Sequence, residues 1–392
     1  SMLISILDLY QLEGKNPNYL RACEIAVEDM VKNRMYITGG LSQTEHFRDD
    51  HNLSCTNADD AQEACAVAHF IYLCRNLFYI TGDPKYINYI EKGLYNNGLG
   101  SKNPQNTFLT SYFSPLQGYK KWKETTHLNG TPCCSASMAR ELVRIPEIMW
   151  TKFSTGGIGV LLYNQASCSD TIVDSKGGNV PLRLEMNTDF PLSGKVILEV
   201  NPEHSSVFPL KLRVPDWTNS YTVLSGDKEF KGEKGEFVTI EKRWKKGDSL
   251  IIDIEMSEHV LEGGESYPGH IAFQRGPQIL AVDSKLNPAF GNLQNIRTDV
   301  KYIPQLENAD KGILPEKWWG SQVYQSGFLH NDSVFLVPYA EAGQMSAHDE
   351  IRTWIRVNDG WTVVDDDQFT YVGKGWNIEH NTQGHYGNTI HT

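Results

Sequence analysis

The sequence predicts a multidomain α+β protein in which helices come first and antiparallel strands follow. Apolar residues recur with the 3.6-residue period of helices over roughly the first 150 positions, together with helix start and stop signals. From about Phe153 onward, short runs with a two-residue period are separated by Gly, Pro, Asn and Asp, as is typical of half-buried strands. The chain has 392 residues, 40% of them hydrophobic, and is long enough for two or three domains.

Two similar stretches of the helical part each predict a helical hairpin. Gly14 and Gly82 are placed to end a helix in the left-handed conformation, and Pro17 and Pro84 follow where a new helix begins. A hairpin cannot bury its apolar face alone, so repeated hairpins indicate a toroid or solenoid of paired helices. Two unrelated helix-turn-helix connections are the alternative, because Gly and Pro are common in turns.

The second part of the chain has the alternation expected of an antiparallel β-sandwich. The predicted strands are 158–163, 182–186, 195–200, 210–214, 237–240 and 249–254, and the pattern continues over 270–283 and 334–339. The last thirty residues resemble the start of a further β module. We therefore predict a helical region at 1–152, a β-sandwich region at 153–345 and a C-terminal β segment at 346–392.

The composition narrows the class of partner. A formal net charge of −12 disfavours nucleic acid and anionic membranes, because the average surface would repel both. No apolar run approaches the ~20 residues that span a bilayer. Aromatic residues make up 11% of the chain, including 9 Trp and 18 Tyr, so neutral sugars remain suitable ligands. The oligomeric state stays open, and so does the compartment, which could be the cytoplasm or the exterior.

The cysteines are more suited to chemistry than to cross-linking. Seven cysteines form an odd and unevenly spaced set, which is a poor disulfide framework in a chain of this length. Two of them, Cys133 and Cys134, are adjacent and stand just before a helix predicted at 135–150. The unpaired N–H groups of a helix N-terminus favour thiolate there. The alternative is that the pair is inert core, since free cysteine is among the most buried residue types.

A second pair of candidate ligands, Glu63 and Cys65, precedes an apolar helix. Thiolates combined with a carboxylate suit a tetrahedral zinc site, because soft sulfur and borderline oxygen both match that ion. Positions two apart in a regular helix point to nearly opposite sides, so both can reach one metal only at an irregular first turn. We therefore expect the regular helix to begin close to Glu63.

A third candidate is the segment that follows Gly39 and Gly40, which contains Glu45-His46-Phe47-Arg48-Asp49-Asp50. Two adjacent glycines favour a loop, and functional acids are often placed on loops that rigid helices hold. The alternative is a solvated charged loop, because most acidic and basic side chains are exposed.

These motifs occur in an order that resembles a known family. They are Tyr-Ile-Thr-Gly-Gly at 36–40, Glu-His-Phe at 45–47, Glu-x-Cys at 63–65, Tyr-Phe-Ser-Pro-Leu at 112–116 and Cys-Cys at 133–134, followed by Pro-Leu-Lys-Leu-Arg-Val-Pro-Asp-Trp at 209–217, Gln-Arg-Gly-Pro at 274–277 and Leu-Val-Pro-Tyr at 336–339. The set resembles the β-L-arabinofuranosidases of glycoside hydrolase family 127 and its relative, family 146, over most of residues 1–345.

The resemblance implies a six-hairpin α/α toroid followed by β-sandwich domains. The helical region is about half as long as such a barrel requires. We therefore expect it to be the C-terminal half of a partial toroid, completed by a barrel segment that precedes Ser1. Without that segment, the chain is expected to hold the metal without necessarily being active.

The resemblance also implies the roles of individual residues. The zinc ligands would be Glu63, Cys65, Cys133 and Cys134, with Cys133 as nucleophile and Glu45 as acid/base. Tyr112 would contact the sugar or the nucleophile, with a buried structural tyrosine as the alternative. His46 is a further candidate contact to the sugar, an L-arabinofuranose unit of an arabinose-containing glycan. The loop before Glu45 departs from the family pattern at Gln43 and Thr44, so His46, Asp49 and Asp50 are alternative acids.

The leading hypothesis is a retaining glycoside hydrolase with a zinc-bound cysteine nucleophile. One alternative is a glycosidase for another sugar on the same scaffold, since a scaffold does not fix the substrate. Another is a non-catalytic carbohydrate-binding protein in which the four ligands form a closed structural zinc site.

Overall fold

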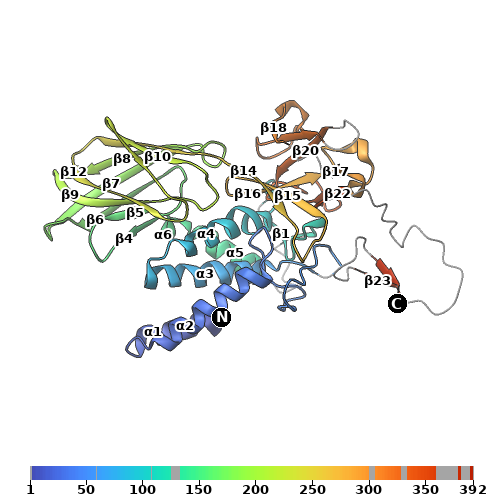
Figure 1. Cartoon of the computed structure of the whole chain (residues 1–392), viewed down its shortest axis with the longest axis horizontal. Coiled ribbons are helices and arrows are strands. Elements are labelled where there is room, and N and C mark those ends of the chain that lie inside the picture. Colours follow the sequence, from blue (N-terminus) through green and yellow to red (C-terminus); the bar gives the residue numbers. More distant parts are fainter. Residues whose placement is uncertain are drawn as a thin grey trace, which may run out of the picture.

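The computed structural model describes residues 2–58, 60–106, 108–124, 133–299, 305–327 and 333–358, together with a short strand pair at 378–380 and 389–391. The fold mixes helices with several antiparallel sheets, as the sequence predicts. Figure 1 shows three parts: a layer of helices, a β-sandwich on one side above it, and a second β region on the other.

The helical part contains two hairpins, α1–α2 and α3–α4, followed by α5 and α6. The helices are α1 (Met2–Leu12), α2 (Pro17–Asp29), α3 (Ala64–Thr81), α4 (Lys85–Gly93), α5 (Cys133–Val143) and α6 (Ile145–Met149), and π-helical turns at Met30–Arg34 and Leu94–Gly98 extend α2 and α4. Both predicted hairpins are confirmed. Gly14 and Gly82 have φ of 75° and 72°, and Pro17 is the first residue of α2. Pro84 lies one position before α4 instead of inside it.

Helix α3 is the central element of this layer, packed against α1, α4 and α5. The sequence analysis found no apolar run of bilayer length, but α3 is the one described helix that is long and apolar enough to cross a bilayer. However, 56% of it is buried inside the protein. A mostly buried apolar helix of this kind is typical of a protein core.

The helix predicted at 135–150 is wrong at both ends. Helix α5 already begins at Cys133 and stops at Val143, α6 covers Ile145–Met149, and Trp150 begins a strand. Pro146 explains the division, because proline lacks the N–H that a continuing helix needs and fits only the first turn of a new one.

The β-sandwich consists of two packed sheets. The six-stranded sheet has the order β11-β10-β13-β8-β7-β6 and the four-stranded sheet the order β12-β9-β5-β4. All pairs are antiparallel except β5 with β9. The bounds are β4 (Trp150–Lys152), β5 (Ile158–Val160), β6 (Ala166–Val173), β7 (Asn179–Thr188), β8 (Lys195–Pro202), β9 (Ser206–Arg213), β10 (Tyr221–Ser225), β11 (Lys228–Lys231), β12 (Phe237–Trp244) and β13 (Asp248–Ile254). Each of the six predicted sandwich strands overlaps one of these.

The second β region is one large sheet with a central order β17-β22-β15-β16-β20-β19-β18. Its strands are β14 (Glu258–Glu262), β15 (His270–Arg275), β16 (Gln278–Asp283), β17 (Arg297–Asp299), β18 (Glu307–Asn308), β19 (Tyr324–Gly327), β20 (Ser333–Pro338), β21 (Glu350–Arg352) and β22 (Ile355–Asn358), with 3₁₀ helices at Pro288–Phe290, Leu293–Asn295 and Lys311–Ile313. The strands predicted at 270–283 and 334–339 lie in this sheet.

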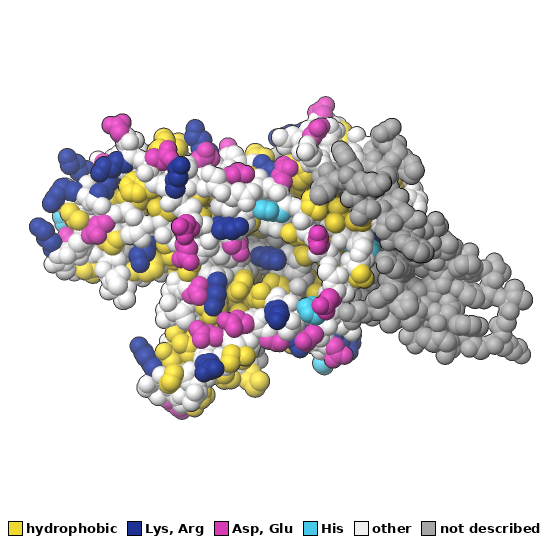
Figure 2. Space-filling model, viewed as in Figure 1, with side chains coloured by type: hydrophobic (Ala, Val, Ile, Leu, Met, Phe, Trp, Pro, Cys, Tyr) yellow, Lys and Arg dark blue, Asp and Glu magenta, His cyan; other side chains and the backbone are white. Residues whose placement is uncertain are grey.

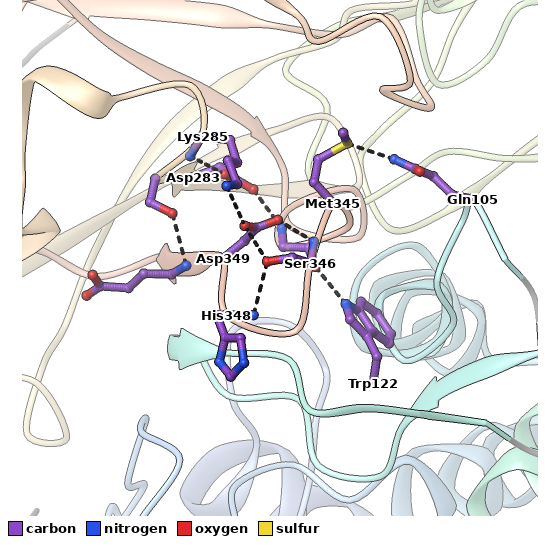
Figure 3. Close-up of polar contacts among 11 residues, drawn as sticks. Gln105, Trp122, Asp283, Lys285, Met345, Ser346, His348 and Asp349 are labelled. Carbon is purple, nitrogen blue, oxygen red and sulfur yellow. Dashed lines mark hydrogen bonds and ion pairs between the residues drawn. The ribbon is translucent and has the colours of Figure 1, made fainter.

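The helical part extends an arm into the second β region. The arm contains β1 (Leu109–Ser111), β2 (Gln117–Tyr119) and β3 (Trp122–Glu124), and β2 pairs with β21. Close to this pairing, Trp122 Nε1 donates to Gly343 O at 2.7 Å and Gln105 Nε2 lies 2.8 Å from Met345 Sδ, as Figure 3 shows. These contacts with the second β region, which is distant in the sequence, therefore hold the segment between α3 and α5 in place.

A buried polar group joins α4 to the sandwich. The Arg213 guanidinium forms an ion pair with Glu91 and donates to Asn88 Oδ1 at 2.5 Å. Trp217 Nε1 donates to the other Glu91 oxygen at 2.8 Å. A buried charge must be paired to be tolerated, so this network fixes the sandwich in one position on the helices.

The predicted domain boundaries remain a prediction. The boundary at 345 falls between β20 and β21, which both pair with β16. We propose that the helical part ends near 149 and the sandwich near 256, and that β20 and β21 belong to one region. The module predicted from Val363 onward lies outside the described residues, apart from the pair β23 (Ile378–His380) and β24 (Thr389–His391).

Candidate functional site

Three cysteine sulfurs from two helices come together at one end of the helical layer. Cys65 lies in the first turn of α3, and Cys133 and Cys134 open α5. Their Sγ atoms all lie within 4.8 Å of one another. The Cys65 backbone N–H donates to Cys134 Sγ at 3.3 Å, although 69 positions separate the two residues. The thiols that the sequence marks as candidates therefore form a single cluster.

Glu63 borders this cluster. It precedes α3 with extended backbone dihedrals, φ −63° and ψ 129°, and the helix begins at Ala64. This confirms the prediction that the regular helix begins close to Glu63. The Cys134 thiol donates to Glu63 Oε1 at 3.6 Å. The irregular backbone thus allows positions 63 and 65 to face the same sulfur.

A tyrosine hydroxyl connects Cys133 to Glu45. The Tyr112 hydroxyl donates to Glu45 Oε1 at 2.6 Å, and the Cys133 thiol donates to the Tyr112 oxygen at 3.4 Å. The Tyr112 carbonyl accepts from the Ala64 N–H at 3.0 Å, which attaches the tyrosine to the start of α3. The two groups that the sequence analysis assigns to nucleophile and acid/base therefore face one hydroxyl.

Glu45 is held in a tight turn with an unusual backbone. Gln43 and His46 exchange backbone hydrogen bonds at 2.8 and 3.1 Å, and between them Thr44 and Glu45 have φ of 52° and 62°. Two positive φ angles at the centre are the pattern of a type I′ hairpin turn, which Asn and Gly usually form. The left-handed conformation costs other residues roughly 1–2 kcal/mol each. Such strain is concentrated at functional sites, which favours a functional loop over a merely solvated one.

Gln62 is a site residue that the sequence analysis missed. Its buried carboxamide accepts from Thr38 Oγ1 and donates to Ser114 O at 2.6 Å. A Cβ at position 40 would lie 2.1 Å from Gln62 Oε1, so Gly40 leaves the room that this side chain needs. Gln62 therefore holds the Thr-Gly-Gly loop against the segment that follows Tyr112.

The other predicted residues of the loop are directed elsewhere. His46 Nδ1 lies 2.7 Å from Thr44 O. Asp50 forms an ion pair with Arg34 at 2.7 Å, and Asp49 is exposed. Among the acids of this loop, the structure brings Glu45 to the hydroxyl that also contacts a cysteine.

Hydrogen bonding within the cluster shifts the pKa values of its thiols. The hydrogen bond with Cys134 lowers the pKa of Cys65 to about 7, with smaller contributions from Ser137 and Cys133, although burial opposes this shift. The same hydrogen bond raises the pKa of Cys134. The Cys65 thiol therefore loses its proton more readily than the Cys134 thiol.

Two further groups of the site have raised pKa values. Burial raises the pKa of Glu63. Burial, followed by hydrogen bonds with Cys133 and Glu45, raises the pKa of Tyr112. The Tyr112 hydroxyl therefore stays protonated and remains available as a donor at physiological pH.

The donor set fits a zinc ion. In a tetrahedral site with Zn–S bonds of about 2.3 Å, the sulfurs lie about 3.8 Å apart, and a carboxylate oxygen lies about 3.6 Å from each sulfur. The three sulfurs lie within 4.8 Å of one another, and Glu63 Oε1 is 3.6 Å from Cys134 Sγ. The three cysteines could thus hold a metal ion, and Glu63 lies beside them at Cys134.

The fold and the site together define a class: a helical layer that carries a thiol and carboxylate centre, followed by two antiparallel β regions. Residues 3–147 match the catalytic domain of the glycoside hydrolase family 127 β-L-arabinofuranosidases, and residues 159–256 match the middle domain of the same family. The chain belongs to glycoside hydrolase family 127. A comparison with curated protein sequences found no significant match.

Solved structures share this fold. A family 127 β-L-arabinofuranosidase from Geobacillus stearothermophilus T6 is 21% identical, with a TM-score of 0.75 over 91% of this chain and 59% of that one. A family 127 β-arabinofuranosidase gives the same four values. A protein described as a glycoside hydrolase is 19% identical, with a TM-score of 0.73 over 91% of this chain and 64% of that one. The chain therefore spans about three fifths of the length of these structures.

Proposed function

We propose that the protein is a retaining glycoside hydrolase that releases L-arabinofuranose from an arabinose-containing glycan. Cys133 is the nucleophile and Glu45 the acid/base. The observation that carries this proposal is the Tyr112 hydroxyl, which contacts both Glu45 and Cys133. The family match supports the reaction class, and the contacts of Tyr112 support the choice of these two residues.

The separation of the two groups supports retention of configuration. Both contact the same hydroxyl, at 2.6 and 3.4 Å, so they are no farther apart than the sum of these distances. That limit is below the roughly 6.5–9.5 Å that inverting enzymes need to place a water, and it is compatible with the roughly 5–5.5 Å of retaining enzymes.

The reaction then has two steps. In the first, the Cys133 sulfur forms a bond to the anomeric carbon while the bond from that carbon to the leaving oxygen breaks, and Glu45 gives its proton to that oxygen. In the second, water forms a bond to the anomeric carbon, its proton passes to Glu45, and the sulfur leaves as thiolate. Two displacements on one carbon restore the original configuration.

The Tyr112 hydroxyl has a positioning role in both steps. Its oxygen lies 2.6 Å from Glu45 Oε1 and 3.4 Å from Cys133 Sγ, so it fixes the separation of acid and nucleophile. The contact of His46 with the sugar also remains a proposal, since its ring lies against Thr44 O.

Glu63, Cys65, Cys133 and Cys134 are the proposed zinc ligands, and the thiol cluster supports this set. Zinc, when bound, keeps its cysteine ligands deprotonated at neutral pH. The protein holds Cys133 on the Tyr112 side of the cluster and Glu63 on the Cys134 side. One thiolate thereby faces the sugar while the others remain behind it.

We further propose that the helical hairpins form part of a six-hairpin α/α toroid. The two confirmed hairpins, with α5 packed on α3, support this arrangement. The thiol cluster lies at the N-terminal ends of α3 and α5, so these ends would surround the sugar site.

A panel of aryl glycosides tests the proposed function. We expect release of nitrophenol from 4-nitrophenyl β-L-arabinofuranoside, with β-L-arabinofuranose as the first product in an NMR time course. The α-L-arabinofuranoside, the β-D-xylopyranoside and the β-D-galactopyranoside serve as matched controls. Preferential hydrolysis of a control would favour a different sugar specificity, and a zinc-loaded protein that hydrolyses none would favour a structural zinc site.

A further inference from the structure

A cavity of about 410 Å³ lies where the helices, the sandwich and the second β region meet. Its volume is within the roughly 300–1,000 Å³ of small-molecule sites. The walls come from the π-helical turn after α2 and the residue that follows it, from α4, from the loop after β9 and from strands β14 to β16 with the turn between β15 and β16. Figure 2 shows this face hollowed between the sandwich and the second β region, with basic, acidic and histidine side chains around the hollow. None of its lining residues belongs to the thiol site.

Two opposite charges face this cavity without a protein partner. Among the described residues, the Lys92 ammonium and the Asp216 carboxylate form no hydrogen bond or ion pair; the Lys92 backbone carbonyl accepts from Asn96 Nδ2 at 2.8 Å. Burial lowers the pKa of Lys92, and the charge of Asp216 opposes that shift. The two groups are thus close enough to influence one another but are separated by a gap.

The space between the Lys92 ammonium and the Asp216 carboxylate favours a neutral ligand that carries hydroxyl groups. A hydroxyl group can accept from the Lys92 ammonium and donate to the Asp216 carboxylate at the same time. A ligand that carries only a carboxylate is attracted by Lys92 but repelled by Asp216, and a ligand that carries only an ammonium is attracted by Asp216 but repelled by Lys92. A saccharide carries many hydroxyls without net charge and fits both sides.

The remaining walls are fixed before a ligand arrives. Trp217 Nε1 donates to Glu91, and the Trp217 carbonyl lies 2.6 Å from His259 Nε2. Gln274 Nε2 donates to Gly276 O at 2.8 Å. Side chains that are already ordered lose little entropy on binding, so a preformed wall favours affinity.

We propose that this cavity is a second, non-catalytic binding site for a neutral saccharide, held between Lys92 and Asp216. The identity of the saccharide as part of the arabinose-containing glycan rests on the proposed function, whereas its chemical class rests on the cavity alone. The site would keep the glycan on the enzyme between successive cleavages.

Met35 lines the cavity and allows a local measurement. In protein labelled with ¹³C-methyl methionine, we expect an arabino-oligosaccharide to shift the Met35 signal, which the Met35→Leu variant identifies. Lys92→Met and Asp216→Asn are each expected to weaken this binding about tenfold or more, because a hydrogen bond to a charged group is lost. Lys85→Met is the matched control on α4, since Lys85 pairs with Glu28 and Asp83 outside the cavity.

Three results would overturn the proposal: a Met35 signal that does not move, unchanged affinity in both cavity variants, or tighter binding of glucuronate or glucosamine than of the neutral probe. Hydrolysis of the aryl arabinofuranoside is measured in the same proteins and is expected to be unchanged by Lys92→Met. If the oligosaccharide shifts the Met35 signal but the aryl substrate is not hydrolysed, the second binding site is supported and the proposed function is wrong.

Discussion

Replacing Cys133 by serine is expected to lower hydrolysis of the aryl β-L-arabinofuranoside by about 10⁴-fold or more, as for other enzymes that lose their nucleophile. A serine hydroxyl is a far weaker nucleophile than a thiolate and has no base placed to activate it. The measurement is kcat/KM of the variant against the unmodified protein, together with its zinc content. Cys65, Cys134 and Glu63 remain in the variant, so bound zinc without activity would separate the nucleophile from the metal site.

Cys168→Ser provides the matched control. Cys168 lies on β6 of the sandwich, is half-buried like Cys133, and is not part of the thiol cluster. We expect its activity to stay within about twofold of the unmodified protein, because surface and sandwich substitutions away from the site seldom alter it. A Cys133→Ser protein as active as the Cys168→Ser protein would exclude Cys133 as nucleophile.

Replacing Glu45 by glutamine is expected to lower kcat/KM by roughly 10²–10⁴-fold for alkyl arabinosides, whose leaving oxygen needs a proton. The loss should be much smaller for nitrophenyl substrates, because nitrophenolate leaves without protonation. Azide should restore turnover of the nitrophenyl substrate by replacing the water that Glu45 activates.

The alternative acids of the loop serve as controls for this prediction. Asp49→Asn and Asp50→Asn remove the other carboxylates, and Asp50 is occupied by Arg34. In both variants, we expect kcat/KM to depend on the leaving group as it does in the unmodified protein. We also expect azide to change their turnover no more than it changes that of the unmodified protein. Two results would exclude Glu45 as the acid/base. One is a larger fall in kcat/KM in Asp49→Asn than in Glu45→Gln, and the other is an equal fall for alkyl and nitrophenyl substrates in Glu45→Gln.

Local sequence signals predicted much of this fold. The Gly and Pro positions predicted both hairpins, because a left-handed glycine and a helix-opening proline act within a few residues. The two-residue alternation predicted the sandwich strands, because each strand has one buried face. Pro146 divides the last helix, and its effect could have been predicted from the sequence as well. The strand order of the second β region could not, since it depends on pairs far apart in the chain.

In the candidate site, too, some features follow from the local sequence and others depend on the packing of distant segments. The thiols and Glu63 follow from residue type and from the geometry of a helix start. The left-handed turn at Thr44 and Glu45 has no sequence sign, because neither residue favours that conformation. Gln62 is inconspicuous for a different reason: its partners Thr38 and Ser114 are brought to it only by the packing of distant segments. The gap between Lys92 and Asp216 likewise exists only where separate parts of the chain meet.

X-ray absorption at the zinc edge, measured on the purified protein, tests most directly whether Glu63, Cys65, Cys133 and Cys134 bind one zinc ion. One zinc per chain is expected, with three sulfur neighbours at about 2.3 Å and one oxygen at about 2.0–2.2 Å. Cys65→Ala should remove one sulfur from this shell. A folded protein that contains no zinc and still hydrolyses the arabinofuranoside, or a zinc ion surrounded by oxygen and nitrogen alone, would contradict the account.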